Sequence, residues 1–111
     1  MSTVDIKTVY AAILAHDSWK CIHNVSFVLV APDQDAERLK SFGEFAGKIK
    51  SITQATSVEI VNMQSLTQGA STVVQVNGVY RGRKQEYLFF DSIQFDDTAI
   101  VKFNSTLKSG S

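Results

Sequence analysis

Residues 86–95 read Glu-Tyr-Leu-Phe-Phe-Asp-Ser-Ile-Gln-Phe and alternate as a β-strand with two unlike faces does. One face would carry Tyr87, Phe89, Asp91, Ile93 and Phe95. The other face would carry Leu88 and Phe90 and then become polar at Ser92 and Gln94. A sheet that is covered on one side should alternate cleanly between apolar and polar residues. The strand therefore predicts one buried face and an opposite face that is part apolar and part polar.

The period-two pattern continues on both sides of this strand. Residues 57–63 and 73–80 alternate before it, and residues 100–107 alternate after it. Turn-forming residues stand at Arg81-Gly82-Arg83 and at Asp96-Asp97. The second half of the chain therefore predicts four antiparallel strands.

The first half of the chain shows helical spacing instead. Apolar residues at three- and four-residue steps predict a helix over residues 4–14 and a second, short helix over residues 19–25. A brief apolar run at residues 27–31, ended by a Pro-Asp turn, predicts a strand. A third helix is expected after Asp35, with the apolar positions of residues 39–49 on its buried side.

These elements predict an α+β fold in which three N-terminal helices pack on one face of a curved antiparallel sheet. At 111 residues, the chain is expected to be a single domain over residues 1–111. Eleven basic and eleven acidic residues give no net charge, which argues against a nucleic-acid module that works by bulk basicity. Arg81, Arg83 and Lys84 lie at one turn and give only a weak signal for RNA contact.

The sequence contains no pattern for a metal, a cofactor or a membrane span. Its one cysteine and two histidines have no further ligands at metal-binding spacing. It has no glycine-rich phosphate loop, nucleophile elbow or zinc-protease motif. Its apolar runs are far shorter than the roughly 20 residues of a membrane-spanning helix. We therefore expect neither a cofactor nor a membrane among its partners.

The helices can cover only one face of the sheet, so the opposite face is expected to stay open. An apolar centre with a polar rim is typical of a protein–protein contact surface. The alternative is a solvated face with two stray apolar residues, which is ordinary on soluble proteins. Val101 and Phe103 are expected on the covered side and Ile100 on the open side. The predicted partner-binding residues are Leu88, Phe90, Ser92, Gln94, Lys102, Asn104, Thr106 and Lys108.

Asp91 is the residue to consider for chemistry, because its alternation places a carboxyl group on the covered, apolar side. Burial there would raise the pKa of Asp91 and allow it to act as an acid or a hydrogen-bond donor. Tyr10 on the first helix could be its neighbour in an internal pocket. The alternative is a structural Asp whose oxygens are satisfied by backbone or hydroxyl groups. His16-Asp17 is interpreted as a local helix cap rather than an acid–base pair.

The order of elements, the junction Ala15-His16-Asp17-Ser18-Trp19 and the long C-terminal sheet resemble the nuclear transport factor 2-like superfamily. The resemblance covers nearly the whole chain. Three segments are most similar to the small subunit of the heterodimer that exports mRNA. They are residues 1–8, residues 78–85 with the aromatic strand after them, and Leu107-Lys108.

This resemblance implies a non-enzymatic nuclear transport protein. Its sheet face would form a heterodimer with a larger mRNA export receptor that carries a similar domain. Lys108 would pair with an acidic residue of that receptor, although lysine is a poorer bidentate donor than arginine. The implied partners also include nuclear pore repeat proteins, with RNA contacted only indirectly or weakly. The implied location is the nucleus and nuclear pore, with shuttling to the cytoplasm.

Two alternatives within the superfamily stay open. In the ketosteroid isomerase-like branch, Asp91 falls where the hydrogen-bonding acid stands, and the internal cone with Tyr10 and Asp91 would hold a small molecule. The general-base position of that branch falls on Ala31, so we expect no enzyme activity. Within the transport branch itself, a homodimeric carrier like nuclear transport factor 2 would bind a small GTPase at the mouth of the cone.

Overall fold

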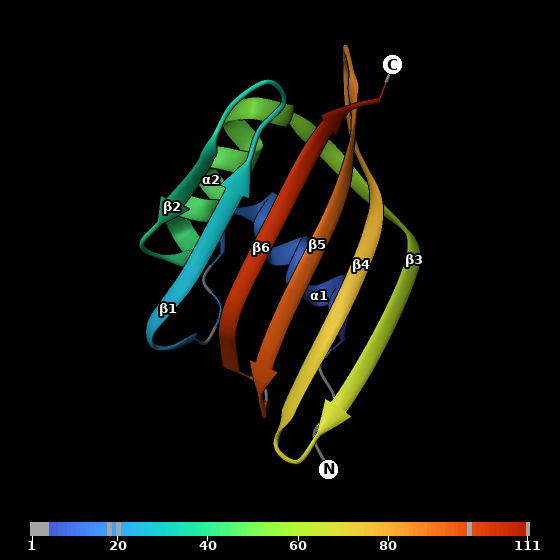
Figure 1. Cartoon of the computed structure of the whole chain (residues 1–111). Coiled ribbons are helices and arrows are strands. Elements are labelled where there is room, and N and C mark those ends of the chain that lie inside the picture. Colours follow the sequence, from blue (N-terminus) through green and yellow to red (C-terminus); the bar gives the residue numbers. More distant parts are fainter. Residues whose placement is uncertain (1–4, 18, 20, 98, 111) are drawn as a thin grey trace.

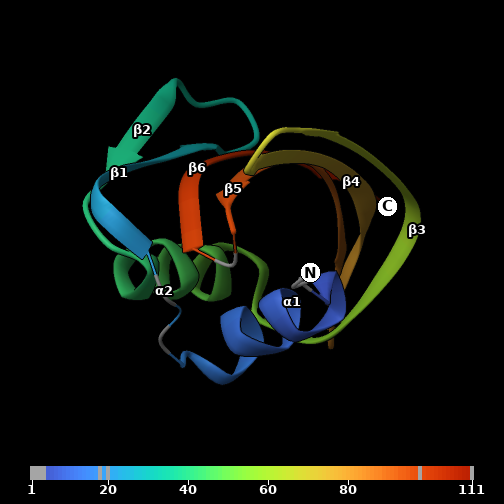
Figure 2. The same ribbon diagram turned by 90° about the horizontal axis from the view of Figure 1, so that it is seen from below.

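The computed structural model describes residues 5–17, 19, 21–97 and 99–110. Within these ranges, two helices lie on the concave side of one curved six-stranded sheet (Figures 1 and 2). The elements in chain order are α1 (Ile6–Ala15), β1 (Cys21–Val30), β2 (Ala36–Leu39), α2 (Phe42–Thr53), β3 (Ala55–Gln68), β4 (Ser71–Gly82), β5 (Glu86–Asp96) and β6 (Ala99–Ser109). The sheet order is β2-β1-β6-β5-β4-β3, and of its pairs only β1–β6 is parallel.

The expected α+β class and the four strands of the second half are confirmed, but the structure has two helices rather than three. Residues 19–25 do not form a helix: β1 begins at Cys21 and continues to Val30. Its apolar residues happen to recur at helical steps, but β2 pairs with residues 27–30 and β6 pairs with residues 21 and 26–30. Tertiary pairing thus overrides a short local pattern.

The helix expected after Asp35 starts later than the sequence indicated. Residues Ala36–Leu39 form the short edge strand β2, antiparallel to β1. The helix α2 begins at Phe42, because Ser41 is its N-cap and accepts a hydrogen bond from the amide of Glu44 at 3.1 Å.

The helix α1 has a cap at each end, which fixes its length. Asp5 is the N-cap and accepts a hydrogen bond from the amide of Lys7 at 3.0 Å. His16 ends the helix in the left-handed conformation, with φ of 57°. The interpretation of His16-Asp17 as a local cap is confirmed. α1 has 10 residues and α2 has 12. Among the described residues, no helix is long and apolar enough to span a bilayer.

Two bulges change which side chains share a face. The register between β3 and β4 shifts between Ile60 and Asn62, so Val61 is the extra residue and Asn62 changes face. The register between β5 and β6 also shifts after Gln94, where Val101 is the extra residue. Ile100 is consequently fully buried on the helix side, and its expected position on the open face is wrong.

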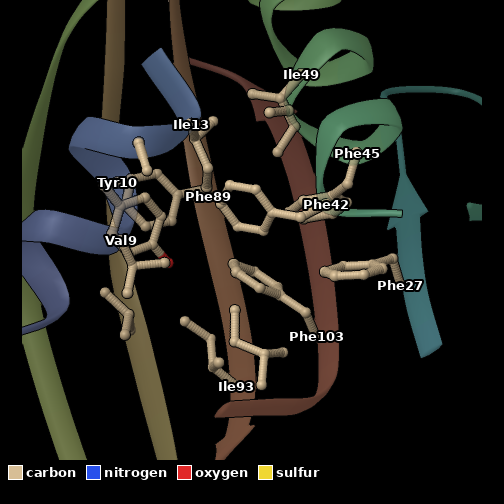
Figure 3. Close-up of a cluster of buried hydrophobic side chains, with 14 of the residues drawn as sticks. Val9, Tyr10, Ile13, Phe27, Phe42, Phe45, Ile49, Phe89, Ile93 and Phe103 are labelled. Atoms are coloured by element: carbon tan, nitrogen blue, oxygen red, sulfur yellow. The ribbon is translucent and has the colours of Figure 1, made fainter. Parts of the chain in front are cut away.

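Aromatic side chains fill the space between the helices and the sheet (Figure 3). The rings of Phe45 and Phe103 have their centroids 4.5 Å apart, and those of Tyr10 and Phe89 are 4.9 Å apart. Each such buried side chain contributes about 1.5–3 kcal/mol to folding. Gly78 on β4 leaves room for the neighbouring strand β3 and for the Phe89 ring of β5, because a Cβ there would lie 2.1 Å from the carbonyl oxygen of Glu59 and 2.8 Å from the Phe89 ring.

Candidate functional site

The eight residues predicted to bind a partner form four cross-strand pairs on one face of β5 and β6. We call the side of the sheet that faces away from α1 and α2 the outer face. The pairs are Leu88–Lys108, Phe90–Thr106, Ser92–Asn104 and Gln94–Lys102. Their neighbours Phe89, Asp91 and Ile93 are buried on the helix side, as the alternation predicted.

The apolar part of the outer face is exposed to solvent. Leu88 is 37% exposed and Phe90 is 49% exposed, although both lie within the central strand β5. The ammonium group of Lys108 lies 5.5 Å from the centroid of the Phe90 ring, a cation–π arrangement. Neither Lys102 nor Lys108 has a carboxylate within ion-pair distance in the part of the chain that the structure describes. The outer face thus combines an exposed ring with two cations that lack an acidic partner in these residues.

A groove of about 420 Å³ runs across the outer face beside Phe90. Its lining is mostly amide and hydroxyl side chains, namely Asn62, Gln64, Gln75, Asn77, Ser92, Asn104 and Thr106. Within the described residues, the Oδ1 atom of Asn104 is buried and accepts no hydrogen bond. A buried acceptor without a donor costs about 1–3 kcal/mol, which a ligand or partner with a suitable donor would recover.

The alternation in the sequence did not predict the β3 and β4 part of this surface. Asn77 lies opposite both Asn62 and Phe90, and Gln75 lies opposite both Gln64 and Ser92. The bulge at Val61 brings Asn62 and Gln64 to the outer face, and the local pattern did not reveal that bulge. The repeated amides, two apart on each strand, were the only signal that could have indicated them.

Asp91 lies on the inner side of the same strand, and its carboxylate is held by two hydroxyl groups. The hydroxyl of Tyr10 donates to Oδ2, and the hydroxyl of Ser105 donates to Oδ1 at 2.6 Å. Burial raises the pKa of Asp91 to about 7, while the hydrogen bonds from Ser105 and Tyr10 act in the opposite direction. The expected neighbourhood of Asp91 and Tyr10 is confirmed. The alternative of an Asp satisfied by hydroxyl groups also describes this geometry.

The interior around Asp91 is occupied by aromatic rings. Tyr10, Tyr80 and Phe89 are each fully buried, and the Phe89 ring lies 4.7 Å from that of Tyr80 and 4.9 Å from that of Tyr10. Burial raises the pKa of Tyr10 and Tyr80 well above the usual value, so both hydroxyl groups stay protonated. Among the described residues, Asp91 is the only buried carboxyl group, which leaves it without a second carboxyl for acid–base catalysis.

The basic turn residues are partly neutralised. Arg81 forms ion pairs with Glu59 on β3 and with Glu86 on β5, the latter at 3.3 Å. Because its charge is shared with two carboxylates, the turn offers less positive charge to a phosphate backbone than its sequence indicates. No group of three or more possible metal ligands occurs within the described ranges.

The fold has several counterparts among solved structures. An NTF2-like protein of unknown function from Burkholderia xenovorans aligns over 96% of this chain and 81% of its own, with a TM-score of 0.62 and 11% identity. An NTF2-like protein from Cytophaga hutchinsonii aligns over 93% and 92%, with a TM-score of 0.59 and 15% identity. A protein from Parabacteroides distasonis, provisionally named a ketosteroid isomerase, aligns over 93% and 85%, with a TM-score of 0.61 and 9% identity.

No family model and no curated protein matches the chain. At these identities the likeness to solved structures shows the fold alone. The chain therefore has the NTF2-like fold, as its sequence predicted, and the narrower resemblance to the mRNA export subunit stays a prediction.

Proposed function

We propose that this chain is a non-enzymatic binding protein whose outer face holds a second polypeptide. The observation that carries the proposal is the exposed, centrally placed pair Leu88 and Phe90 beside a groove with an unsatisfied acceptor, the Oδ1 of Asn104. A surface of this composition, apolar in the middle and polar around it, fits a protein interface. A partner that donates a hydrogen bond to Asn104 would remove the cost of the unsatisfied acceptor, and by covering Phe90 it would also remove the cost of exposing an apolar ring to water.

The partner that fits best is a larger mRNA export receptor with a similar domain, which would make this chain the small subunit of a heterodimer. This narrower assignment rests on the resemblance of residues 1–8, 78–85 and 107–108 to that subunit. The charges of Lys102 and Lys108 would meet acidic residues of the receptor and set the rate and specificity of association. The chain would then act at the nuclear pore and shuttle to the cytoplasm, with pore repeat proteins as further partners.

The second candidate is a ligand binder of the ketosteroid isomerase-like kind. One observation favours it: within the described residues, the buried hydroxyl of Tyr80 has no hydrogen-bond partner. That hydroxyl and the Tyr10–Asp91 pair could contact a small carbonyl compound. The packed rings of Tyr10, Tyr80 and Phe89 weigh against this candidate, because a ligand could enter only by displacing them.

The test is affinity capture from a nuclear extract of the source cells, followed by mass spectrometry. The wild-type chain should retain a larger export receptor with an NTF2-like domain in a one-to-one complex. Phe90→Lys should reduce this capture at least about tenfold, because it puts a charge in the apolar centre of the interface. Ala11→Lys adds the same charge at an exposed position of α1 and should leave capture unchanged.

Two results would contradict the proposal. One is a wild-type chain that is recovered alone. The other is equal capture by the wild-type and Phe90→Lys chains, which would show that the outer face is not the contact surface.

A further inference from the structure

The two edges of the sheet differ in how they are protected. The edge strand β2 has only four residues, and it carries Glu37 and Arg38 and is followed by Lys40. Short edge strands and charged side chains are the usual means by which proteins prevent pairing at a sheet edge. The opposite edge strand β3 has 14 residues, and residues 60–80, from the middle of β3 to two residues before the end of β4, include no charged residue and no proline.

The distal half of β3 makes little use of its side chains within the monomer. All residues from 61 to 68 are exposed, including Val61, Met63 and Leu66, which are each more than half exposed. Within the described part of the chain, β4 is the only strand that pairs with β3. These eight residues, three of them apolar and five polar but uncharged, therefore form a neutral edge about 27 Å long, at 3.4 Å per residue.

The hairpin geometry identifies the backbone groups that face outward from this edge. Gly69 and Ala70 form a two-residue turn between the facing residues Gln68 and Ser71, and Gly69 has φ of 61°. In a two-residue hairpin the pair next to the turn is hydrogen-bonded, and hydrogen-bonded pairs alternate along the strands. The amide and carbonyl groups of Met63, Ser65 and Thr67 therefore point away from β4.

We propose that this edge pairs with the β3 strand of a second copy of the chain. The two strands would run antiparallel about a two-fold axis near Gln64 and Ser65, and the two sheets would become continuous. Such pairing places each stretch against itself, so it is compatible with an uncharged stretch and unfavourable for a charged one. The absence of charge over residues 60–80 is the property that selects a second copy as the occupant.

This contact adjoins the proposed partner surface at the groove residues Asn62 and Gln64 but does not cover its apolar centre. Edge pairing extends the sheet beyond β3, which lies at one end of the curved sheet with β4 between it and β5 (Figure 2). Leu88 and Phe90 lie on β5 and would stay exposed. Two copies joined through β3 could each bind a partner, which would place two partner-binding faces in one assembly. The contact involves one strand from each copy, so we expect it to be weaker than a standard protein interface and to depend strongly on concentration.

The test is sedimentation velocity of the purified full chain from micromolar concentration to about 1 mM. The wild-type chain should form dimers as the concentration rises. Met63→Lys keeps an unbranched side chain but places a charge on the edge, and it should raise the dimer dissociation constant about tenfold or more. Leu88→Lys makes a comparable change on the outer face and should leave the dimer intact.

Hydrogen exchange of the wild-type chain provides a second measurement that does not depend on the folding of any variant. The amides of Ser65 and Thr67 should become more protected as the concentration rises, whereas the Met63 amide already donates to Asn62 Oδ1 at 2.9 Å in the monomer. A chain that stays monomeric at about 1 mM would overturn the proposal, as would a dimer that Leu88→Lys dissociates and Met63→Lys does not. Neither result would bear on affinity capture by the outer face, so failure of this inference is distinguishable from failure of the proposed function.

Discussion

Phe89 and Phe90 are neighbours in β5, yet they lie in opposite environments. Phe89 is fully buried and its ring packs between Tyr10 and Tyr80, whereas Phe90 is half exposed with Lys108 near its ring. The inner face of the strand is therefore completed by the chain itself. The outer face leaves a half-exposed ring, two lysines without a carboxylate partner and a buried acceptor without a donor among the described residues, and these are the features on which the proposed partner surface rests.

The largest expected effect comes from truncating each phenylalanine in turn. Phe89→Ala removes a core ring and should lower the free energy of unfolding by about 3–5 kcal/mol. Phe90→Ala removes an exposed ring and should change it by about 0.5 kcal/mol or less. Urea unfolding of the isolated chain measures both values. Similar losses for the two variants would show that the outer face is already covered in the isolated chain.

The second effect is a pH dependence that originates at Asp91. Burial raises its pKa from 3.8 to about 7, so between about pH 4 and 7 the folded chain holds a proton that the unfolded chain has released. Its contribution to stability is fully present below about pH 4 and is lost as the pH rises to about 7. The loss is on the order of 4 kcal/mol at 1.4 kcal/mol per pH unit.

Asp91→Asn cannot ionise and should remove this dependence. The difference in unfolding free energy between the variant and the wild type should move in favour of the variant as the pH rises from about 4 to 7, and then become constant. Asp96→Asn changes an exposed residue at the end of the same strand and serves as the control. A constant difference between Asp91→Asn and wild type across this range would show that Asp91 is ionised in the folded chain throughout.

The sequence predicted the parts of this comparison that depend on local alternation. It placed Phe89, Asp91 and Ile93 on the buried side and Leu88 and Phe90 on the open side, because β5 has no bulge. The neighbourhood of Tyr10 and Asp91 was also predicted, and the resemblance indicated the fold that the solved structures show.

What the sequence did not predict depends on contacts between distant segments. In β1, residues 27–30 lie between β2 and β6, and residues 21 and 26 pair with β6, but neither neighbouring strand is visible in the local pattern. The bulges at Val61 and Val101 each moved nearby residues to the other face, which misplaced Ile100 and concealed the amides of the groove. A one-residue register change reverses every side chain after it, so such errors affect whole faces.

The third prediction concerns Gly78, where the Glu59 carbonyl oxygen and the Phe89 ring come so close to β4 that a side chain would not fit. A methyl group at this position would overlap the carbonyl oxygen of Glu59 and the ring of Phe89, so Gly78→Ala should cost about 3 kcal/mol. Gly43→Ala is the matched change in α2, where the added Cβ would be 3.8 Å from the Ser41 hydroxyl. It should stabilise the chain by up to about 1 kcal/mol, because alanine favours the helix. Thermal unfolding of both variants measures the contrast, and a Gly78→Ala chain as stable as wild type would contradict the packing described for β3 and β5.

The smallest effect separates the folding role of the outer face from its binding role. Lys108→Ala removes the cation near the Phe90 ring and should lower the unfolding free energy by about 0.5 kcal/mol, since the contact is exposed. If Lys108 instead serves a partner with an acidic rim, the same change should slow association with that partner, and the loss should diminish at high salt. Stopped-flow association at two salt concentrations measures this, with Lys50→Ala on α2 as the control for loss of a positive charge. An equal effect of the two substitutions on the association rate would mean that the outer face uses its aromatic ring but not its charge.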